Sequence, residues 1–208
     1  MAVQTLGDLR SRLRSWSNRK DLSDDLLDDF INIAQSRLNR LLRIPPLEST
    51  ILLTPNADGV VPIPRSFIEM KAVWFTDPGG KKVRLERKES DYVEELAAHQ
   101  EGTPKYFSRK GLDFHLAPKP TTAADDSLEL YYYISLQPLT LASDSNWFLA
   151  DAPEVILYGA LTEIALYLRD EIGAGQWEAK FQNHAKEIQN IEDNSAYSGS
   201  SIAINGTQ

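Results

Sequence analysis

Residue types that bind metals or act as nucleophiles are sparse in this sequence and stand far apart. The chain contains three histidines and no cysteine, and His99, His115 and His184 form no His-x-x-x-His or Glu-x-x-His pattern. Ser108 and the pair Ser200-Ser201 lack His and Asp partners that the sequence can identify. Without cysteine, thiolate zinc sites, disulfides and thiol nucleophiles are excluded. We therefore expect no metal site and no nucleophilic catalysis.

Patterns for phosphate loops and for paired catalytic carboxylates do not occur either. The sequence has no Gly-x-x-x-x-Gly-Lys and no Gly-x-Gly-x-x-Gly pattern, and we interpret Gly79-Gly80-Lys81-Lys82 as a hairpin turn. Four aspartates occupy the first turns of a predicted helix, where the dipole favours anions: Asp24, Asp25, Asp28 and Asp29. We expect a solvated face with ordinary pKa values, because a catalytic pair would need burial or a shared proton. The sequence thus predicts no enzyme and no cofactor.

A basic cluster precedes these aspartates. It consists of Arg10, Arg12, Arg14, Arg19 and Lys20. Contact with phosphates is one interpretation of such a cluster. The preferred interpretation for Arg10, Arg12 and Arg14 is an inter-subunit contact, with the acidic run 21–29 or the acidic carboxy-terminal portion as its counterpart.

Three consecutive tyrosines, Tyr131-Tyr132-Tyr133, have the composition of a platform on which bases could stack. On a strand, Tyr131 and Tyr133 share one face, while Tyr132 shares the other with Leu130 and Ile134. That distribution is typical of a sheet with one core side and one partly covered side. It favours a core or a subunit interface over base stacking.

Composition and charge limit the function classes. A chain of 208 residues that is 42 % hydrophobic and 25 % charged is long enough to form one sizeable core and a second, smaller one. The net charge of -8 argues against nucleic acid as the main ligand, and residues 125–208 alone carry -10. The longest apolar stretch, 155–168, is interrupted by Thr162 and Glu163, so no membrane span is expected. Because residues 1–16 lack the apolar core of a secretory signal, we expect synthesis in the cytoplasm without export.

Hydrophobic periodicity predicts helices at both ends of the chain. Apolar residues at three- and four-residue steps predict a helix over 5–17 and a second one from Ser23 to the prolines at 45 and 46. Near the other end, Asp151 and Glu154 form a capping-box pattern that opens an almost wholly apolar helix. We expect Gly173 and Gly175 to break that helix and a last one to cover 176–193.

Between residues 47 and 146 the pattern is typical of strands. Turn residues predict three hairpins, which pair 51–54 with 60–63, 71–75 with 82–86, and 105–109 with 112–117. A short helix over 90–98 and a strand over 128–134 complete the region. The predicted class is α+β: a bundle of about four helices from 1–46 and 147–193, an inserted antiparallel β region over 47–146, and a flexible tail over 194–208.

The sequence resembles the head-to-tail adaptor, or connector, proteins of tailed double-stranded DNA bacteriophages, of the short-tailed type. The residues that carry the resemblance run along most of the chain, in the segments LGDLRSRL, DDFINIAQSRLNRLLR, VPIPRSFIEMKAVWF, GTPKYFSRKGLDFHLAPKP, LELYYYISLQPL and SNWFLADAPEVILYGALTEIALYLRD. These are patterns of packing residues and contain no catalytic motif.

The resemblance implies a structural virion protein at the head-tail junction, made in the host cytoplasm. Such proteins form a ring, commonly a dodecamer, under the portal protein; the ring extends the DNA channel and seats the tail nozzle or other tail proteins. No catalysis, cofactor or membrane is implied. Genomic DNA would pass through the channel without sequence-specific binding.

Residue roles follow from this resemblance as expectations. The tail 194–208 would clamp the portal, with Tyr197, Ile202 and Ile204 as anchors. An acidic channel lining would let DNA slide without sticking, and its expected residues are Glu163, Asp170, Glu171 and Glu178. Three alternatives stay open: a tail-completion or stopper protein, a small nucleic-acid-binding module, and an enzyme whose site has no motif.

Overall fold

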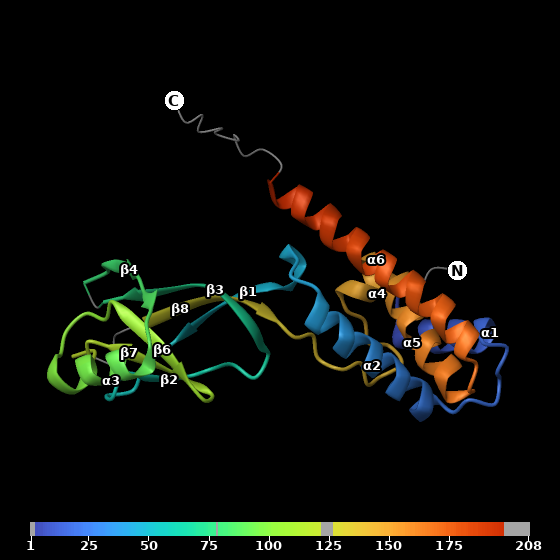
Figure 1. Cartoon of the computed structure of the whole chain (residues 1–208), viewed down its shortest axis with the longest axis horizontal. Coiled ribbons are helices and arrows are strands. Elements are labelled where there is room, and N and C mark those ends of the chain that lie inside the picture. Colours follow the sequence, from blue (N-terminus) through green and yellow to red (C-terminus); the bar gives the residue numbers. More distant parts are fainter. Residues whose placement is uncertain (1–2, 78, 122–126, 198–208) are drawn as a thin grey trace. The chain divides into compact units, whose positions relative to one another are not determined.

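The computed structural model describes residues 3–77, 79–121 and 127–197, and it has two compact units. One unit comprises Met1–Leu47 together with Leu136–Gln208, and the other comprises Glu48–Ser135 (Figure 1). The described residues form six α-helices and two four-stranded sheets, which confirms the mixed α+β class. Among these helices none is long and apolar enough to cross a membrane.

The helical unit contains five of those helices. They are α1 (Leu6–Trp16), α2 (Asp24–Leu41), α4 (Trp147–Asp151), α5 (Pro153–Tyr167) and α6 (Glu171–Tyr197), and a 3-10 turn covers Pro45–Leu47. Thr5 caps α1 in a reciprocal box with Asp8, and Ser23 caps α2, as their sequence patterns predict. The helical unit therefore has five described helices where the sequence predicted about four, because the apolar segment near residue 150 forms two helices.

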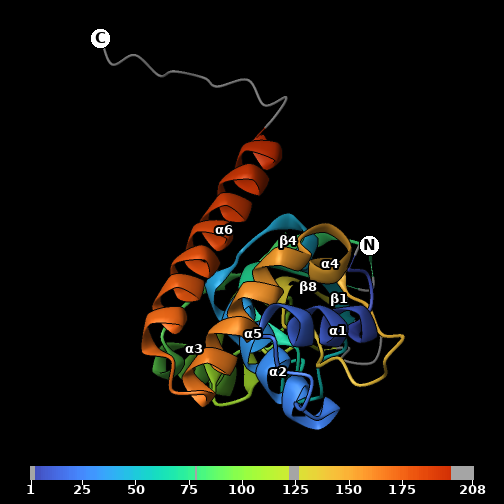
Figure 2. The ribbon, with the colours of Figure 1, turned by 90° about the vertical axis from the view of Figure 1, so that its right-hand side faces the viewer.

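Helix α5 lies in the middle of this unit, with α1, α2 and α6 around it (Figure 2). Most of its side chains are buried, in accordance with an apolar pattern on all sides of the helix. Gly159 allows α2 and α6 to pack closely against α5. A Cβ atom at this position would lie 2.8 Å from Cβ of Ala34 in α2 and 3.0 Å from the Phe181 ring in α6. The spacing of α5 from its neighbours therefore depends on a residue without a side chain.

Two predicted helix boundaries near α5 are wrong. Asp151 ends α4 instead of capping α5, whose N-cap is Ala152, and Asn146 caps α4 by accepting a bond from Leu149 N. The chain turns between α5 and α6 at Arg169, which has a φ of 59°, and not at the glycines 173 and 175, which lie inside α6. Asp170 Oδ1 accepts a 2.9 Å bond from Gly173 N, so a side-chain cap starts α6 there.

The β unit is built on two sheets with one shared core. The first has the order β1 (Glu48–Leu53), β8 (Ser127–Ile134), β3 (Phe67–Thr76) and β4 (Lys82–Arg84). The second has the order β2 (Val60–Pro62), β7 (Asp113–Ala117), β6 (Tyr106–Lys110) and β5 (Glu86–Arg87), in which only β5 and β6 run parallel. Helix α3 (Ser90–His99) packs on β6 and β7.

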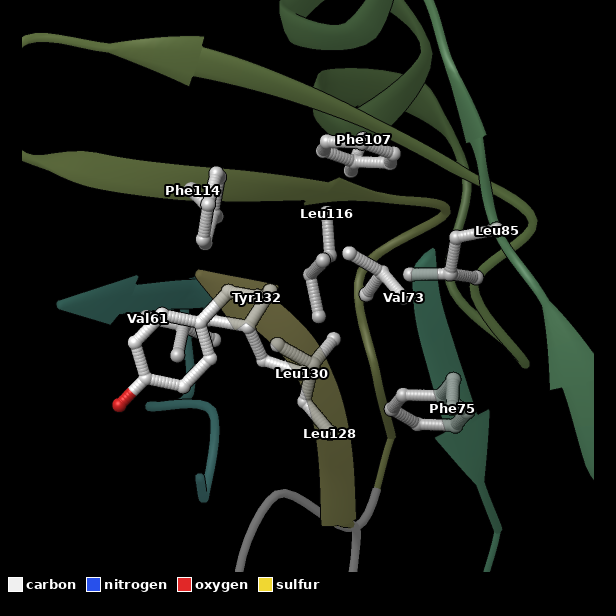
Figure 3. Packing of buried hydrophobic residues seen from close by; sticks show 10 residues of the cluster. All are labelled: Val61, Val73, Phe75, Leu85, Phe107, Phe114, Leu116, Leu128, Leu130 and Tyr132. Carbon is white, nitrogen blue, oxygen red and sulfur yellow. The ribbon is translucent and has the colours of Figure 1, made fainter. Parts of the chain in front are cut away.

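Side chains from both sheets meet in this core (Figure 3). Leu130 of β8 pairs with Ile51 of β1 and with Val73 of β3, while Phe107 and Leu116 face each other across β6 and β7. All but Ile51 belong to one buried cluster that also includes Tyr132. The alternation of apolar and polar residues along each strand places this cluster on one face of each sheet.

Two of the three predicted hairpins are confirmed and one is wrong. Strands β3 and β4 pair as expected, and so do β6 and β7, although Glu86, which was expected in the β3–β4 hairpin, pairs with Tyr106 of β6. Strands β1 and β2 do not pair with each other: β1 pairs with β8 and β2 with β7. The intervening turn still forms, since Asn56 Oδ1 accepts bonds from Asp58 N and Val60 N. Local turn chemistry is satisfied, but each of the two strands pairs with a strand from later in the chain.

Candidate interaction surfaces

The potential catalytic or metal-binding residues of the sequence lie in separate environments. His99 ends α3 and His115 lies in β7, whereas His184 in α6 contacts the Tyr158 ring at 5.0 Å between centroids. Ser108 is buried in β6 with an exposed fraction of 2 %. Within the described ranges, no group of three or more His, Asp or Glu side chains is placed to hold a metal ion.

The arginines of α1 face the aspartates of α2 in the same chain. Arg10 binds Asp28 through two nitrogens, Nε at 2.7 Å and Nη2 at 2.5 Å, and Arg14 binds Asp24. The hydrogen bond from Arg14 lowers the pKa of the Asp24 carboxyl below its ordinary value. Asp24 is exposed, as a solvated face predicts, but the expectation of an ordinary pKa is wrong for it, because α1 packs against the start of α2. Arg12 lies on the same helix and is half-buried.

Two of the predicted channel-lining acids also have a partner within the unit. Arg37 of α2 reaches Glu163 of α5 at 3.3 Å and Glu178 of α6 at 2.6 Å, and its guanidinium lies 4.3 Å from the centroid of the Phe181 ring. Burial raises the pKa of Glu178, but hydrogen bonds from Arg37 and Gln182 outweigh this effect, and the pKa is lowered. This cluster joins α2 to two helices that lie more than a hundred residues further along the chain, so spacing could not reveal it.

The other candidate residues of α5 and α6 lie at the two ends of α6. Asp170 and Glu171 are exposed at its start. Tyr197 is its last residue, so the helix continues four residues beyond the predicted end at Asp193. Ile202 and Ile204 lie outside the described residues.

The tyrosines of β8 are divided between two faces, as the sequence predicts for a strand. Tyr132 is in the core, 4 % exposed. Tyr131 and Tyr133 lie on the opposite face, where Lys82 is 5.9 Å from the Tyr131 ring and Lys71 is 5.5 Å from the Tyr133 ring. The helix of this unit, α3, packs on the other sheet. This face therefore keeps partly exposed aromatic rings beneath lysines.

A second aromatic cluster lies on the helical unit, where the sequence alone did not indicate one. Trp16, Tyr158 and Trp177 form a triangle with centroid distances of 5.8 to 6.1 Å. Lys180 lies 4.4 Å from the Trp177 centroid. The three- and four-residue spacing of Trp177, Lys180 and His184 could have indicated that these side chains share one face of a helix. It could not indicate Trp16 and Tyr158, which come from other helices.

Comparison with known proteins identifies the family. The family model described as SU10 adaptor protein matches residues 4–203. A search of the curated proteins found no match.

Proposed function

The chain belongs to the SU10 adaptor protein family, and we propose that it forms a ring that joins the capsid portal to the tail and continues the DNA channel. Membership makes it a structural adaptor protein of a phage virion, one that associates with other head or tail proteins. The observation that carries the proposal is the match over residues 4–203, which includes both units. In accordance with a structural role, several ion pairs join helices or strands of the described residues, among them Arg10–Asp28 and Arg37–Glu178.

In this proposal the segment 194–208 provides the contact with the portal protein. Its first four residues belong to the end of α6, and its sequence consists of small polar residues with isolated hydrophobic ones, among them Tyr197, Ile202 and Ile204. Hydrophobic side chains spaced along a polar segment are suited to separate pockets on a partner. Ring closure then depends on the portal, because the ring contacts by themselves are weak.

The channel lining in this proposal comes mainly from Asp170 and Glu171. Glu163 and Glu178 contribute less negative charge to a channel, because Arg37 binds both of them. Exposed carboxylates repel DNA phosphates and allow the genome to slide. An electrostatic map of the assembled ring tests this part, and a basic channel would contradict it.

The test of the main proposal is assembly on a portal ring. We expect the purified chain to be monomeric by light scattering and to form a collar when it is mixed with its candidate portal, as seen by electron microscopy. A variant that lacks residues 198–208 keeps α6 and should not form the collar. The double variant Ile202→Ser, Ile204→Ser should weaken it, whereas Ser200→Ala should not.

Other outcomes would point to a different role. A chain that ignores the portal and binds only a tail component would be a tail-completion or stopper protein. Binding to duplex or single-stranded DNA that weakens steeply with salt would support the nucleic-acid-binding alternative.

A further inference from the structure

Two arginines of the β unit lie on neighbouring strands and have no ion pair with its described acids. Five lysines of this unit form ion pairs with its carboxylates: Lys71, Lys82, Lys88, Lys110 and Lys119. Arg87 in β5 and Arg109 in β6 are both exposed. Among the residues that the structure describes, no carboxylate lies within ion-pair distance of either arginine. Arg65 and Arg84 have no ion pair with a described residue either, but they lie elsewhere in the unit. Two guanidinium groups on neighbouring strands therefore lie without an ion-pair partner in a chain of net charge -8.

Both arginines line two adjoining hollows of the surface. The larger, of about 420 Å³, is polar and is completed by Lys88, Glu89 and Ser90. The smaller, of about 230 Å³, is completed by Phe67, Ile68, Glu69, Met70 and Phe114. A ligand at this position can therefore place a charged group and an apolar group on either side of the same two guanidinium groups.

The position of Arg109 is supported by its surroundings. Its guanidinium carbon lies 5.4 Å from the centroid of the Phe67 ring, and its Nε donates a hydrogen bond to Gly111 O at 3.3 Å. Contact with an aromatic ring restricts the side chain without using the outer nitrogens. The outer guanidinium nitrogens of Arg109, which can bind a carboxylate, are thus held at the surface before a ligand binds.

Strand β5 is the edge of its sheet, next to these arginines. Glu86 N and Lys88 N donate to Lys105 O and Phe107 O, each at 2.9 Å. Since consecutive residues of a strand direct their N–H and C=O groups to opposite sides, the backbone of Arg87 points away from β6. An extended peptide can add to such an edge through main-chain hydrogen bonds.

We propose that the edge of β5, with Arg87 and Arg109, binds an extended segment of another protein in which carboxylates alternate with apolar side chains. Nucleic acid fits less well, because its closely spaced phosphates would meet Glu69 and Glu89, and because apolar residues, among them Phe67 and Met70, take part in lining the smaller hollow. The inference goes beyond the adaptor role and does not depend on it, since the site lies within the β unit.

The test is binding of a labelled octapeptide in which glutamate alternates with valine, measured by fluorescence anisotropy on the full chain. We expect binding to the unmodified protein and at least a tenfold loss of affinity in the double variant Arg87→Ala, Arg109→Ala. The peptide with glutamine in place of glutamate should bind at least tenfold more weakly. Both arginines are exposed, and circular dichroism checks that the variants fold.

Arg84→Ala is the matched control, because Arg84 is an exposed arginine of β4 in the other sheet. The affinity of the Arg84→Ala variant for the glutamate peptide should stay within twofold of that of the unmodified protein. Equal binding of the glutamine peptide, or unchanged affinity in the double variant, would overturn the proposal. A labelled single-stranded DNA that binds more tightly than the peptide and loses affinity in the same variant would overturn it in favour of a phosphate site. None of these results depends on whether the chain assembles on a portal.

Discussion

The two units use their charged and aromatic side chains differently. In the helical unit, arginines contact acids on neighbouring helices: Arg10 and Arg14 bind aspartates of α2, and Arg37 binds Glu163 and Glu178. In the β unit, lysines pair at the surface, while Arg87 and Arg109 lie beside open hollows. Part of the charge that the sequence offers is therefore paired between helices in the first unit, whereas Arg87 and Arg109 of the second have no acidic partner among the described residues.

The difference shows that charge in a sequence is weak evidence for a binding surface when amphipathic helices pack together. Helices of one bundle bring residues more than a hundred positions apart within ion-pair distance, as Arg37 and Glu178 show. A two-layer β structure keeps one face of each sheet outside the core, so alternate residues of a strand remain accessible. The proposed peptide site accordingly lies in the β unit, where Arg87 and Arg109 are exposed beside the two hollows.

The largest effect is expected from Tyr132→Ala, in the core of the β unit. Tyr132 is 4 % exposed and its ring stacks on Phe67 at 5.8 Å, so removal of the ring should cost about 3–5 kcal/mol. Tyr131→Ala, on the other face of the same strand, should cost about 1 kcal/mol. In the Tyr132→Ala variant, backbone amide hydrogen exchange should become faster within residues 48–135 and stay unchanged in the helical unit. Equal effects of the two substitutions would contradict the division of β8 into a core face and an open face.

A smaller effect is expected from Gly159→Ala in the helical unit. The added methyl group would lie 2.8 Å from Cβ of Ala34, so we expect a destabilisation of about 1–3 kcal/mol. Gly175→Ala is the control: its methyl group would meet no atom within 4 Å, and it should stabilise α6 by up to about 1 kcal/mol. Thermal unfolding and hydrogen exchange measure both, and stabilisation by Gly159→Ala would show that α5 is not closely packed.

The smallest effect concerns the acid sensitivity of the helical unit. The pKa of Glu178 is lowered from its ordinary value of 4.5 in the folded chain. Its ionised form therefore contributes stability above pH about 4.5, and this contribution is lost as the pH falls below that value. Glu178→Gln should be less stable than the unmodified chain at pH 7, by less than about 1 kcal/mol because the side chain is one-third exposed. Denaturant titrations at pH 7 and pH 3.5 should show that the difference shrinks in acid; a constant difference would contradict the role of the ionised pair.

Local patterns predicted much of the fold. Turn residues at Asp77–Gly80 and Lys110–Gly111 predicted two hairpins correctly, and capping residues Thr5 and Ser23 marked the starts of α1 and α2. Each of these features depends on contacts between residues close in sequence. The resemblance of the packing residues to an adaptor family also held at the level of the family.

The sequence by itself determined most of the elements and their apolar faces, because periodicity and caps are properties of neighbouring residues. The adaptor family followed from the resemblance of its packing residues. Only the tertiary structure decided that β1 and β2 separate into two sheets, that Arg37 joins three helices, and that Arg87 and Arg109 remain without acidic partners among the described residues. These outcomes depend on burial and on pairing between distant segments, and such pairing leaves no pattern in the local sequence.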